Sequence, residues 1–279
     1  MNSPAELGRT AHFYTIAFTI RTGSSLLCDY LTAAGLGQPS EYFQFPFGVA
    51  NARHYRQLNV QPGDFVSYLR QLFAHRAQNG FFGVKLTWEH QAVLVEEARK
   101  HWDEIRGLDD LFPGNRWVYL RRRDKIGQAI SGWRAMKSGK WHSSDIIAAQ
   151  DAKPEYGFHE ILNVLFLLLN DEYHWDNYFG LNRIEPQIIF YEDFQNDPKG
   201  TVLKLVRFVQ QAPGGISVPD EKDLVEGSRC TVLRDQYSAD LKARFLDDLE
   251  HMGDDPRRSP PGTRLRSWMA LLETLRPRG

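Results

Sequence analysis

The chain has 279 residues, of which 42% are hydrophobic and 25% are charged, and its formal net charge at pH 7 is −1. A chain of this length can bury a sizeable core, either as one large α/β domain or as two smaller ones. The near-neutral charge argues against bulk electrostatic binding of nucleic acid or of an anionic membrane surface, so any anion site has to be local.

Cysteine content and hydropathy predict the compartment. Cys28 and Cys230 give neither a disulfide framework nor a metal-binding pattern, which is typical of a reducing compartment. The first ten residues lack a basic segment followed by an apolar one, so no secretory signal is expected. The longest apolar run, residues 164–169, is too short to span a bilayer. These features predict a cytoplasmic protein without membrane insertion and without a metal site.

The first predicted unit is a strand, a turn and a helix. Residues 13–18 (FYTIAF) are apolar, β-branched and aromatic, which favours a buried strand. A polar turn covers residues 19–25. Apolar side chains then recur at helical spacing over residues 24–34, and Gly35 suits the end of a helix. This order of elements directs backbone amides and the positive end of a helix dipole at an anion.

The side chains of this turn suit an anion but do not match the Walker A loop of proteins that bind nucleoside triphosphates. The Ser24 and Ser25 hydroxyls can donate hydrogen bonds, and Arg21 adds a permanent positive charge. The Walker A pattern, G-x-x-x-x-G-K-S/T, needs a lysine that this turn lacks. Taken alone, the turn also fits a joint that binds nothing, in which Gly23 serves only the backbone geometry.

Two charged residues follow in unusual places. Glu41 is the only charged residue in the loop GLGQPSEYFQFPFG, and it can reach the mouth of the anion site or remain a carboxylate on a surface rim. Lys85 lies in the second half of the predicted strand 81–86 (FFGVKL), where burying an unpartnered ammonium group is costly. Lys85 therefore lies near an anion at the strand end, or extends to solvent at a sheet edge.

A second strand-to-helix joint carries three arginines. The predicted strand 116–120 (RWVYL) runs into residues 121–123 (RRR), and a helix follows over residues 128–136. Ligands of parallel sheets collect at the carboxyl ends of the strands, so these three arginines, with the Ser131 hydroxyl in the following helix, predict a second anion site. The alternative is a solvated basic turn that pairs with Asp124.

The remaining pattern predicts an α/β protein with a P-loop-like three-layer fold, in which helices flank a central, mostly parallel sheet. Residues 1–252 are expected to form one domain, and residues 253–279 a linker followed by a helix that packs on the core or on a partner. Further helices are predicted at residues 65–76, 91–106, 158–179, 199–210 and 238–252, and a further strand at residues 187–191.

Several of these joints resemble one family in the same order along the chain. The turn I-R-T-G-S-S-L-L resembles the R-S-G-S-T-L-L loop of bacterial carbohydrate sulfotransferases, and P-S-E-Y-F-Q resembles P-Q-E-F/Y-F-Q of the trehalose 2-sulfotransferase family. G-V-K-L-T-W is similar to that family's G-G-K-L-M-W. The segment R-R-D-K-I-G-Q-A-I-S-G-W-R-A is similar to that family's 3′-phosphate segment, R-P-D-x-x-x-Q-A-V-S-x-W-R-A. Y-E-D-F is similar to the Y-E-D-L element that is widespread in sulfotransferases.

The resemblance implies 3′-phosphoadenosine-5′-phosphosulfate as the sulfuryl donor, without a metal. It also implies a small-molecule or carbohydrate acceptor, and it is consistent with a homodimer. Glu41 would be the general base, while Arg21 and Lys85 would stabilise charge at the transferred group. The residues implied in donor binding are Arg21, Thr22, Gly23, Ser24, Ser25, Leu26, Arg122 and Ser131.

Two other functional classes remain as alternatives. A P-loop kinase would use ATP, although the turn lacks the lysine and no Walker B aspartate follows the strand RWVYL. A non-catalytic nucleotide-binding protein would keep the anion sites without needing Glu41 or Lys85. Aromatic residues near Glu41 could stack on a sugar or an apolar acceptor, or pack beneath the loop; they are Tyr42, Phe43, Phe45, Phe47, Trp88 and Trp141.

Overall fold

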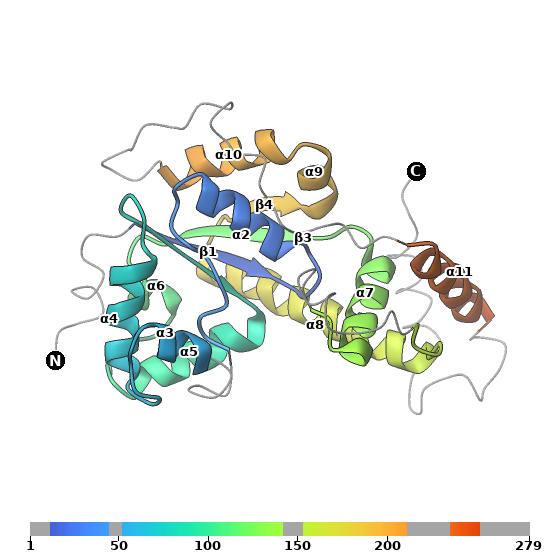
Figure 1. Ribbon diagram of the computed structural model, residues 1–279, viewed down its shortest axis with the longest axis horizontal. Coiled ribbons are helices and arrows are strands. Elements are labelled where there is room, and N and C mark those ends of the chain that lie inside the picture. The colour runs from blue at the N-terminus through green and yellow to red at the C-terminus, as the bar shows by residue number, and fades with distance from the viewer. Residues whose placement is uncertain (1–11, 45–51, 142–152, 211–234, 252–279) are drawn as a thin grey trace. The chain divides into compact units, whose positions relative to one another are not determined.

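The structure is a computed structural model of the chain and describes residues 12–44, 52–141, 153–210 and 235–251 (Figure 1). The chain forms two compact units. The first comprises Met1–Arg123 and Leu169–Thr231, and the second comprises Asp124–Leu168 and Val232–Gly279. The predicted boundary after residue 252 stays a prediction, because residues 252–279 lie outside the described part of the chain.

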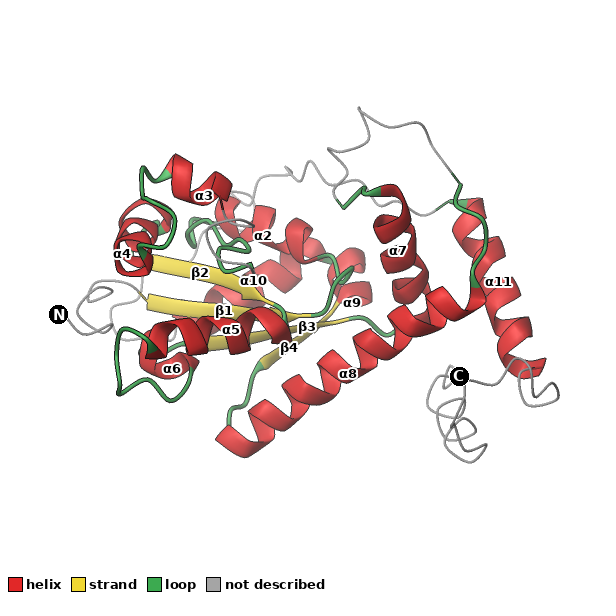
Figure 2. Ribbon diagram, turned by 90° about the horizontal axis from the view of Figure 1, so that it is seen from below, coloured by secondary structure: helices red, strands yellow, loops and turns green. Residues whose placement is uncertain are grey.

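The first unit contains a four-stranded sheet with the order β2-β1-β3-β4. Every neighbouring pair is parallel, so the carboxyl ends of all four strands lie at one edge of the sheet (Figure 2). The strands are β1 (His12–Phe18), β2 (Phe81–Leu86), β3 (Arg116–Arg121) and β4 (Gln187–Phe190). The predicted α/β class with a parallel sheet is therefore confirmed.

Alternating side chains divide the core into two apolar layers. One layer packs against α4 (Phe65–Arg76), α5 (Trp88–Arg99), α6 (Leu108–Leu111) and the C-terminal part of α8 (Phe158–Asn182). Its strand residues are Phe13, Ala17, Phe82, Val84, Leu86, Trp117 and Tyr119. The other layer packs against α2 (Ser24–Ala33) and α10 (Pro198–Gln210), with Tyr14, Ile16, Phe18, Phe81, Val118, Leu120 and Ile189 from the strands. Helices thus flank the sheet on both faces.

Two predicted segments differ from the structure. The helix expected over residues 91–106 is α5, which begins at Trp88 and ends at Arg99. It ends early because the chain turns so that Trp102 and Ile105 enter the core, while the Arg99 guanidinium donates to the Ile105 carbonyl oxygen at 3.0 Å. Strand β4 also ends one residue before its predicted end, because Tyr191 begins the short helix α9 (Tyr191–Asn196). The helix α3 (Ala52–Gln57) was not predicted, nor was α6.

The second unit is helical in its described part. It contains α7 (Lys125–Ser138), α11 (Gln236–Glu250) and the N-terminal part of α8. Asp124 caps α7 by accepting from the Gly127 amide at 2.9 Å and also pairs with Lys242 of α11 at 2.8 Å. Arg134 of α7 forms two hydrogen bonds with the Asp235 carboxylate, at 2.8 and 2.9 Å. Ion pairs that involve the N-cap residues of both helices therefore join α7 to α11.

Candidate active site

Residues 19–25, which the sequence predicts to bind an anion and which are called the phosphate loop below, join β1 to α2 in the first unit. Arg21 (φ 64°) and Gly23 (φ 78°) have left-handed backbone conformations, and the Thr22 hydroxyl donates to the Thr19 carbonyl oxygen at 2.8 Å. Gly23 is the N-cap of α2 and has no side chain that could cap the amides of the first helical turn. Those amides and the positive helix terminus form an arrangement that binds anions.

Gly23 is required here for two reasons. Its positive φ is unfavourable for a residue with a Cβ atom. A Cβ atom would also lie only 2.7 Å from Cδ2 of Tyr191, at the junction of β4 and α9. The loop therefore runs directly against the Tyr191 ring, where no other residue type fits without a shift.

Lys85 connects the loop to Glu41. Its side chain is only 7% exposed, and its ammonium group lies 2.8 Å from Oε1 of Glu41. The same Nζ atom donates to Oγ of Ser25 at 3.1 Å and to Oγ of Ser24 at 3.3 Å. β2 is an edge strand, yet this lysine does not extend into solvent. It lies near the anion loop, as one of the two interpretations predicted.

The loop that carries Glu41 is fixed to the core. The backbone carbonyl oxygen of Ser40 accepts a hydrogen bond from the Lys85 amide at 3.1 Å, which places Glu41 beside the end of β2. Tyr42 and Phe43 are buried in the first apolar layer, and the Tyr68 hydroxyl donates to the Tyr42 carbonyl oxygen at 2.8 Å. These two aromatic residues therefore pack beneath the loop. Phe45 and Phe47 lie outside the described residues.

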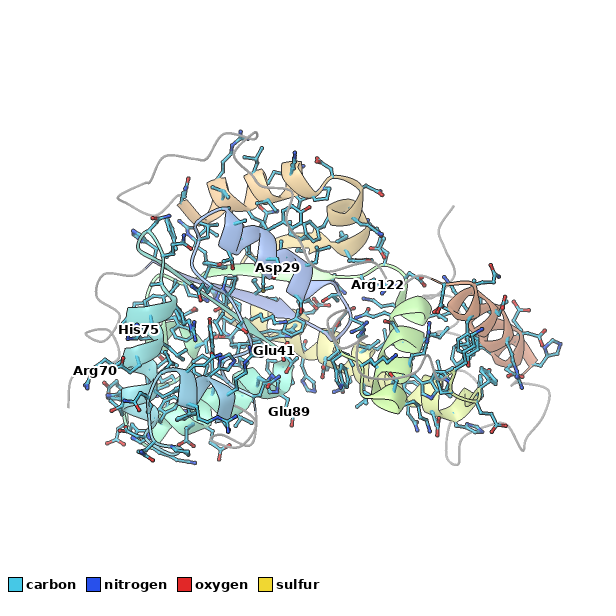
Figure 3. All side chains as sticks on the ribbon, in the orientation of Figure 1. Asp29, Glu41, Arg70, His75, Glu89 and Arg122 are labelled. Carbon is cyan, nitrogen blue, oxygen red and sulfur yellow. The ribbon has the colours of Figure 1, made fainter. Side chains whose placement is uncertain are left out.

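The charge state of Glu41 depends on its neighbours. Burial acts to raise the pKa of this carboxyl group, but the charge and hydrogen bond of Lys85, helped by the Gln44 amide at 2.7 Å, lower the pKa below its usual value. Glu41, labelled in Figure 3, keeps 23% of its side chain exposed. It is therefore an ionised carboxylate at neutral pH that solvent can still reach.

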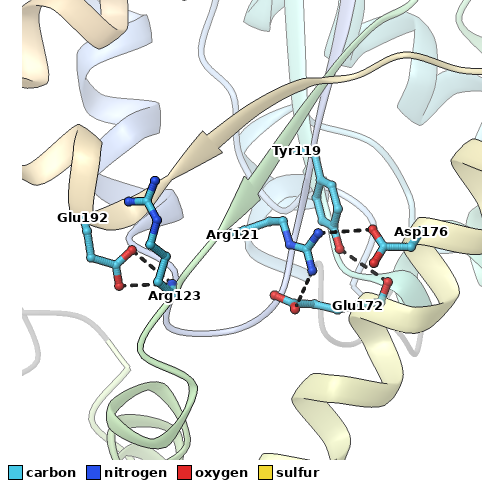
Figure 4. A network of polar contacts seen from close by, with 6 residues as sticks. All are labelled: Tyr119, Arg121, Arg123, Glu172, Asp176 and Glu192. Atoms are coloured by element: carbon cyan, nitrogen blue, oxygen red, sulfur yellow. Dashed lines mark hydrogen bonds and ion pairs between the residues drawn. The ribbon is translucent and has the colours of Figure 1, made fainter. Parts of the chain in front are cut away.

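The three consecutive arginines have different partners, and two of them, Arg121 and Arg123, are drawn in Figure 4. Arg121 pairs with Glu172 at 3.0 Å and with Asp176 at 3.4 Å, both on α8. Arg123 pairs with Asp193 of α9 at 2.7 Å. Two of the three charges are thus bound to carboxylates, although neither uses Asp124, the partner that the sequence suggested.

Arg122, the third arginine, turns toward the phosphate loop. Its Nη1 atom donates to the backbone carbonyl oxygen of Arg21 at 3.2 Å, and its guanidinium lies 5.0 Å from the centre of the Tyr191 ring. The structure brings together Arg21, Ser24, Ser25, Lys85 and Glu41 with Arg122 at one end of the sheet. Ser131 lies on α7 in the second unit, and its binding role stays a prediction. The binding roles of Thr22 and of Leu26, a partly buried residue of α2 that packs against the second apolar layer, also stay predictions.

Sequence reasoning did not single out Tyr191 or Gln44 as site residues. Tyr191 begins the Y-E-D-F motif, so the motif marked its position but not its contacts. Gln44 ends the P-S-E-Y-F-Q motif, so the motif likewise marked its position but not its contact with Glu41, which depends on the turn between them. In the described ranges, no group of three or more His, Cys, Asp and Glu side chains is placed to hold a metal ion, and no helix is long and apolar enough to cross a bilayer.

Comparison with known protein families identifies the class of this site. Residues 13–227 match the sequence profile of the Stf0 sulphotransferase family. The chain belongs to this family. That range includes the phosphate loop, Glu41, Lys85, Arg122 and Tyr191, so the whole candidate site lies inside the matched part of this Stf0 enzyme. The resemblance stated from the motifs is confirmed, and sulfotransferase is favoured over both the kinase and the non-catalytic alternative.

Curated relatives of this Stf0 sulfotransferase agree with that class. A trehalose 2-sulfotransferase of Mycolicibacterium smegmatis is 25% identical over 210 residues, covering 64% of this chain and 76% of the relative. A trehalose 2-sulfotransferase of Mycobacterium tuberculosis is 25% identical over 234 residues, covering 74% and 87%. A solved sulfotransferase domain from the Synechococcus PCC 7002 olefin synthase aligns over 95% of this chain and 94% of its own, with 14% identity and a TM-score of 0.41.

Proposed function

We propose that this Stf0 sulfotransferase transfers a sulfuryl group from 3′-phosphoadenosine-5′-phosphosulfate to a hydroxyl group of a carbohydrate or other small-molecule acceptor. The observation that carries the proposal is the position of Lys85. One buried ammonium group contacts both the Glu41 carboxylate and the hydroxyls of the phosphate loop. Proton acceptor and anion site are thus held next to each other, as group transfer to a hydroxyl requires.

The donor fits the residues at the strand ends. The phosphosulfate group is an anion, and the uncapped first turn of α2 with Ser24 and Ser25 suits it. Arg122, which lies beside the same loop, suits a second anionic group such as the 3′-phosphate.

In the proposed transfer, one bond to sulfur forms and one breaks. The acceptor oxygen forms a bond to sulfur, while the bond between sulfur and the bridging oxygen of the donor breaks. The acceptor proton passes to Glu41, which is ionised because Lys85 lowers its pKa against the effect of burial. Lys85 and Arg21 stabilise the negative charge that develops on the sulfuryl and bridging oxygens. Adenosine 3′,5′-bisphosphate leaves.

The acceptor is proposed from the relatives. Because the curated relatives are named trehalose 2-sulfotransferases, trehalose is the first acceptor to test, followed by other sugars and small hydroxylated metabolites. A homodimer and a cytoplasmic location remain predictions of the original resemblance and of composition. Light scattering of the purified protein and fractionation of cells test these two predictions.

Calorimetric titration with adenosine 3′,5′-bisphosphate, AMP and ATP, each with and without Mg²⁺, tests the donor. We expect binding of the bisphosphate that is independent of Mg²⁺, and much weaker binding of AMP. A preference for ATP with Mg²⁺ would contradict the proposal and support a kinase. Binding of no nucleotide would leave the sulfotransferase without its assigned donor.

A Glu41→Gln variant tests the base. General-base catalysis typically contributes about 10²–10⁴-fold, so kcat should fall by a factor in that range while affinity for adenosine 3′,5′-bisphosphate is retained. Glu96→Gln is the matched control, since Glu96 is an exposed carboxylate on α5. Normal turnover in the Glu41→Gln variant would remove Glu41 as the base.

A further inference from the structure

Tyr191 contacts both parts of the proposed donor site. On one side the ring lies against Gly23: a Cβ atom added to Gly23 would be 2.7 and 2.8 Å from two carbon atoms of the Tyr191 ring. On the other side the Arg122 guanidinium lies 5.0 Å from the ring centre, a distance typical of a cation–π contact. The same Arg122 donates to the Arg21 carbonyl oxygen at 3.2 Å, which closes a loop of contacts through Tyr191, Gly23 and Arg21.

These contacts distinguish Tyr191 from an ordinary core residue. Only 8% of it is exposed, yet it belongs to neither apolar layer of the first unit. Phe194, one turn further along α9, is fully buried within the second layer and packs edge-on against Tyr30. The two aromatic residues on one short helix therefore have different surroundings, and only Tyr191 faces the phosphate loop and Arg122.

The junction that carries Tyr191 is fixed to the end of β3 by contacts between Arg123 and three residues. Both carboxylate oxygens of Glu192 accept the backbone amide of Arg123 at 3.1 Å. Asp193 accepts two hydrogen bonds from the Arg123 guanidinium, at 2.7 and 2.8 Å. That guanidinium also lies 4.0 Å from the ring centre of Phe190. Residues 190–193 thus attach β4 and α9 to the arginine segment, so Tyr191 has a defined place relative to Arg122.

We propose that Tyr191 is a positioning residue that sets the spacing between the phosphate loop and Arg122, so that one ligand with two anionic groups contacts both at once. This inference rests on the proposed donor. A ligand that spans two preset sites gains affinity, because its second contact is made without further ordering of the protein. Loss of the ring would leave each anion site present but remove their fixed spacing.

The expected signature is a selective loss of affinity for the two-anion ligand. In Tyr191→Leu, affinity for adenosine 3′,5′-bisphosphate should fall by about tenfold or more, within the usual range of coupling between two sites, while affinity for AMP changes much less. Tyr191→Phe should bind as the wild type does, because the inference assigns the role to the ring. In the Arg122→Ala background, Tyr191→Leu should add little further loss, since the spacing then has no second site to serve.

Calorimetric titration of these full-length variants with both nucleotides is the test, and the ratio of the two affinities is the readout. Phe194→Leu is the matched control, because it removes a buried aromatic ring from the same helix and should lower the melting temperature without changing the ratio. An unchanged ratio in Tyr191→Leu would overturn the inference. So would an equal change of the ratio in Phe194→Leu, or a loss in Tyr191→Phe as large as in Tyr191→Leu. Failure of the wild type to bind the bisphosphate would instead overturn the donor assignment, and this inference with it.

Discussion

Replacing Gly23 by alanine tests the geometry of the phosphate loop. The new Cβ atom would lie 2.7 and 2.8 Å from two carbon atoms of the Tyr191 ring, whereas carbon atoms in favourable contact are about 3.5–4.0 Å apart. Overpacking of this kind typically costs about 1–3 kcal/mol. The left-handed backbone at φ 78° adds about 1–2 kcal/mol for a residue with a Cβ atom. We therefore expect Gly23→Ala to lower the free energy of unfolding by about 2–5 kcal/mol.

Thermal unfolding followed by circular dichroism measures this loss. Each kcal/mol shifts the melting temperature of a domain of about 150–250 residues by about 2–4 °C, so the expected decrease is about 4–20 °C. Gly114→Ala is the matched control: its φ is 71°, but nothing lies within 4 Å of its added Cβ atom, so only the backbone cost applies.

A second variant separates the two costs. The double variant Gly23→Ala with Tyr191→Ala removes the ring that the new methyl group would strike. Relative to Tyr191→Ala alone, the free energy of unfolding of the double variant should fall only by the backbone cost measured in Gly114→Ala. If Gly23→Ala unfolds at the same temperature as Gly114→Ala, the loop does not contact Tyr191 as described, and the argument is refuted.

Two further predictions concern pH. In Lys85→Met, the pKa of Glu41 should rise, because burial still raises it while the charge and hydrogen bond of Lys85 no longer lower it. The acid limb of the pH profile of kcat/KM should therefore move to higher pH. An unmoved limb would show that another group titrates there. Hydrogen bonds from Arg134 are the main reason that the pKa of Asp235 falls to about 2. A depressed pKa stabilises the fold above the usual carboxyl pKa, and the gain is lost as the pH falls through about 2. Arg134→Ala should therefore melt below the wild type at pH 7 and approach it near pH 2, and an equal difference at both values would contradict the linkage.

The sequence predicted the elements whose signals are local. The apolar runs before residues 19 and 121 identified β1 and β3, because buried parallel strands are continuously apolar. The turn chemistry after each strand then placed Arg21 and the three consecutive arginines, residues 121–123, at the same end of the sheet. The end of α5 was missed because Trp102 and Ile105 continue a helical spacing, although tertiary packing turns the chain there.

The partners of charged residues could not be predicted in the same way. Arg121 and Arg123 look equivalent to Arg122 in the sequence, but Glu172 lies on α8 and Asp193 on α9, far along the chain. Which guanidinium turns toward the phosphate loop depends on these distant carboxylates. Lys85 is a similar case: its sequence context left two interpretations open, and contacts with Glu41, Ser24 and Ser25 decided between them.

The strand order separates the proposed chemistry across the width of the sheet. β2 and the loop paired with it carry Lys85 and Glu41, whereas β3 and β4 lead to Arg122 and Tyr191 on the opposite side of β1. The base proposed for the acceptor and the arginine proposed for the nucleotide therefore come from opposite sides of β1, with the phosphate loop between them. If the proposed roles hold, changes in the loop that carries Glu41 should alter acceptor use while the contacts of Arg122 and Tyr191 stay in place.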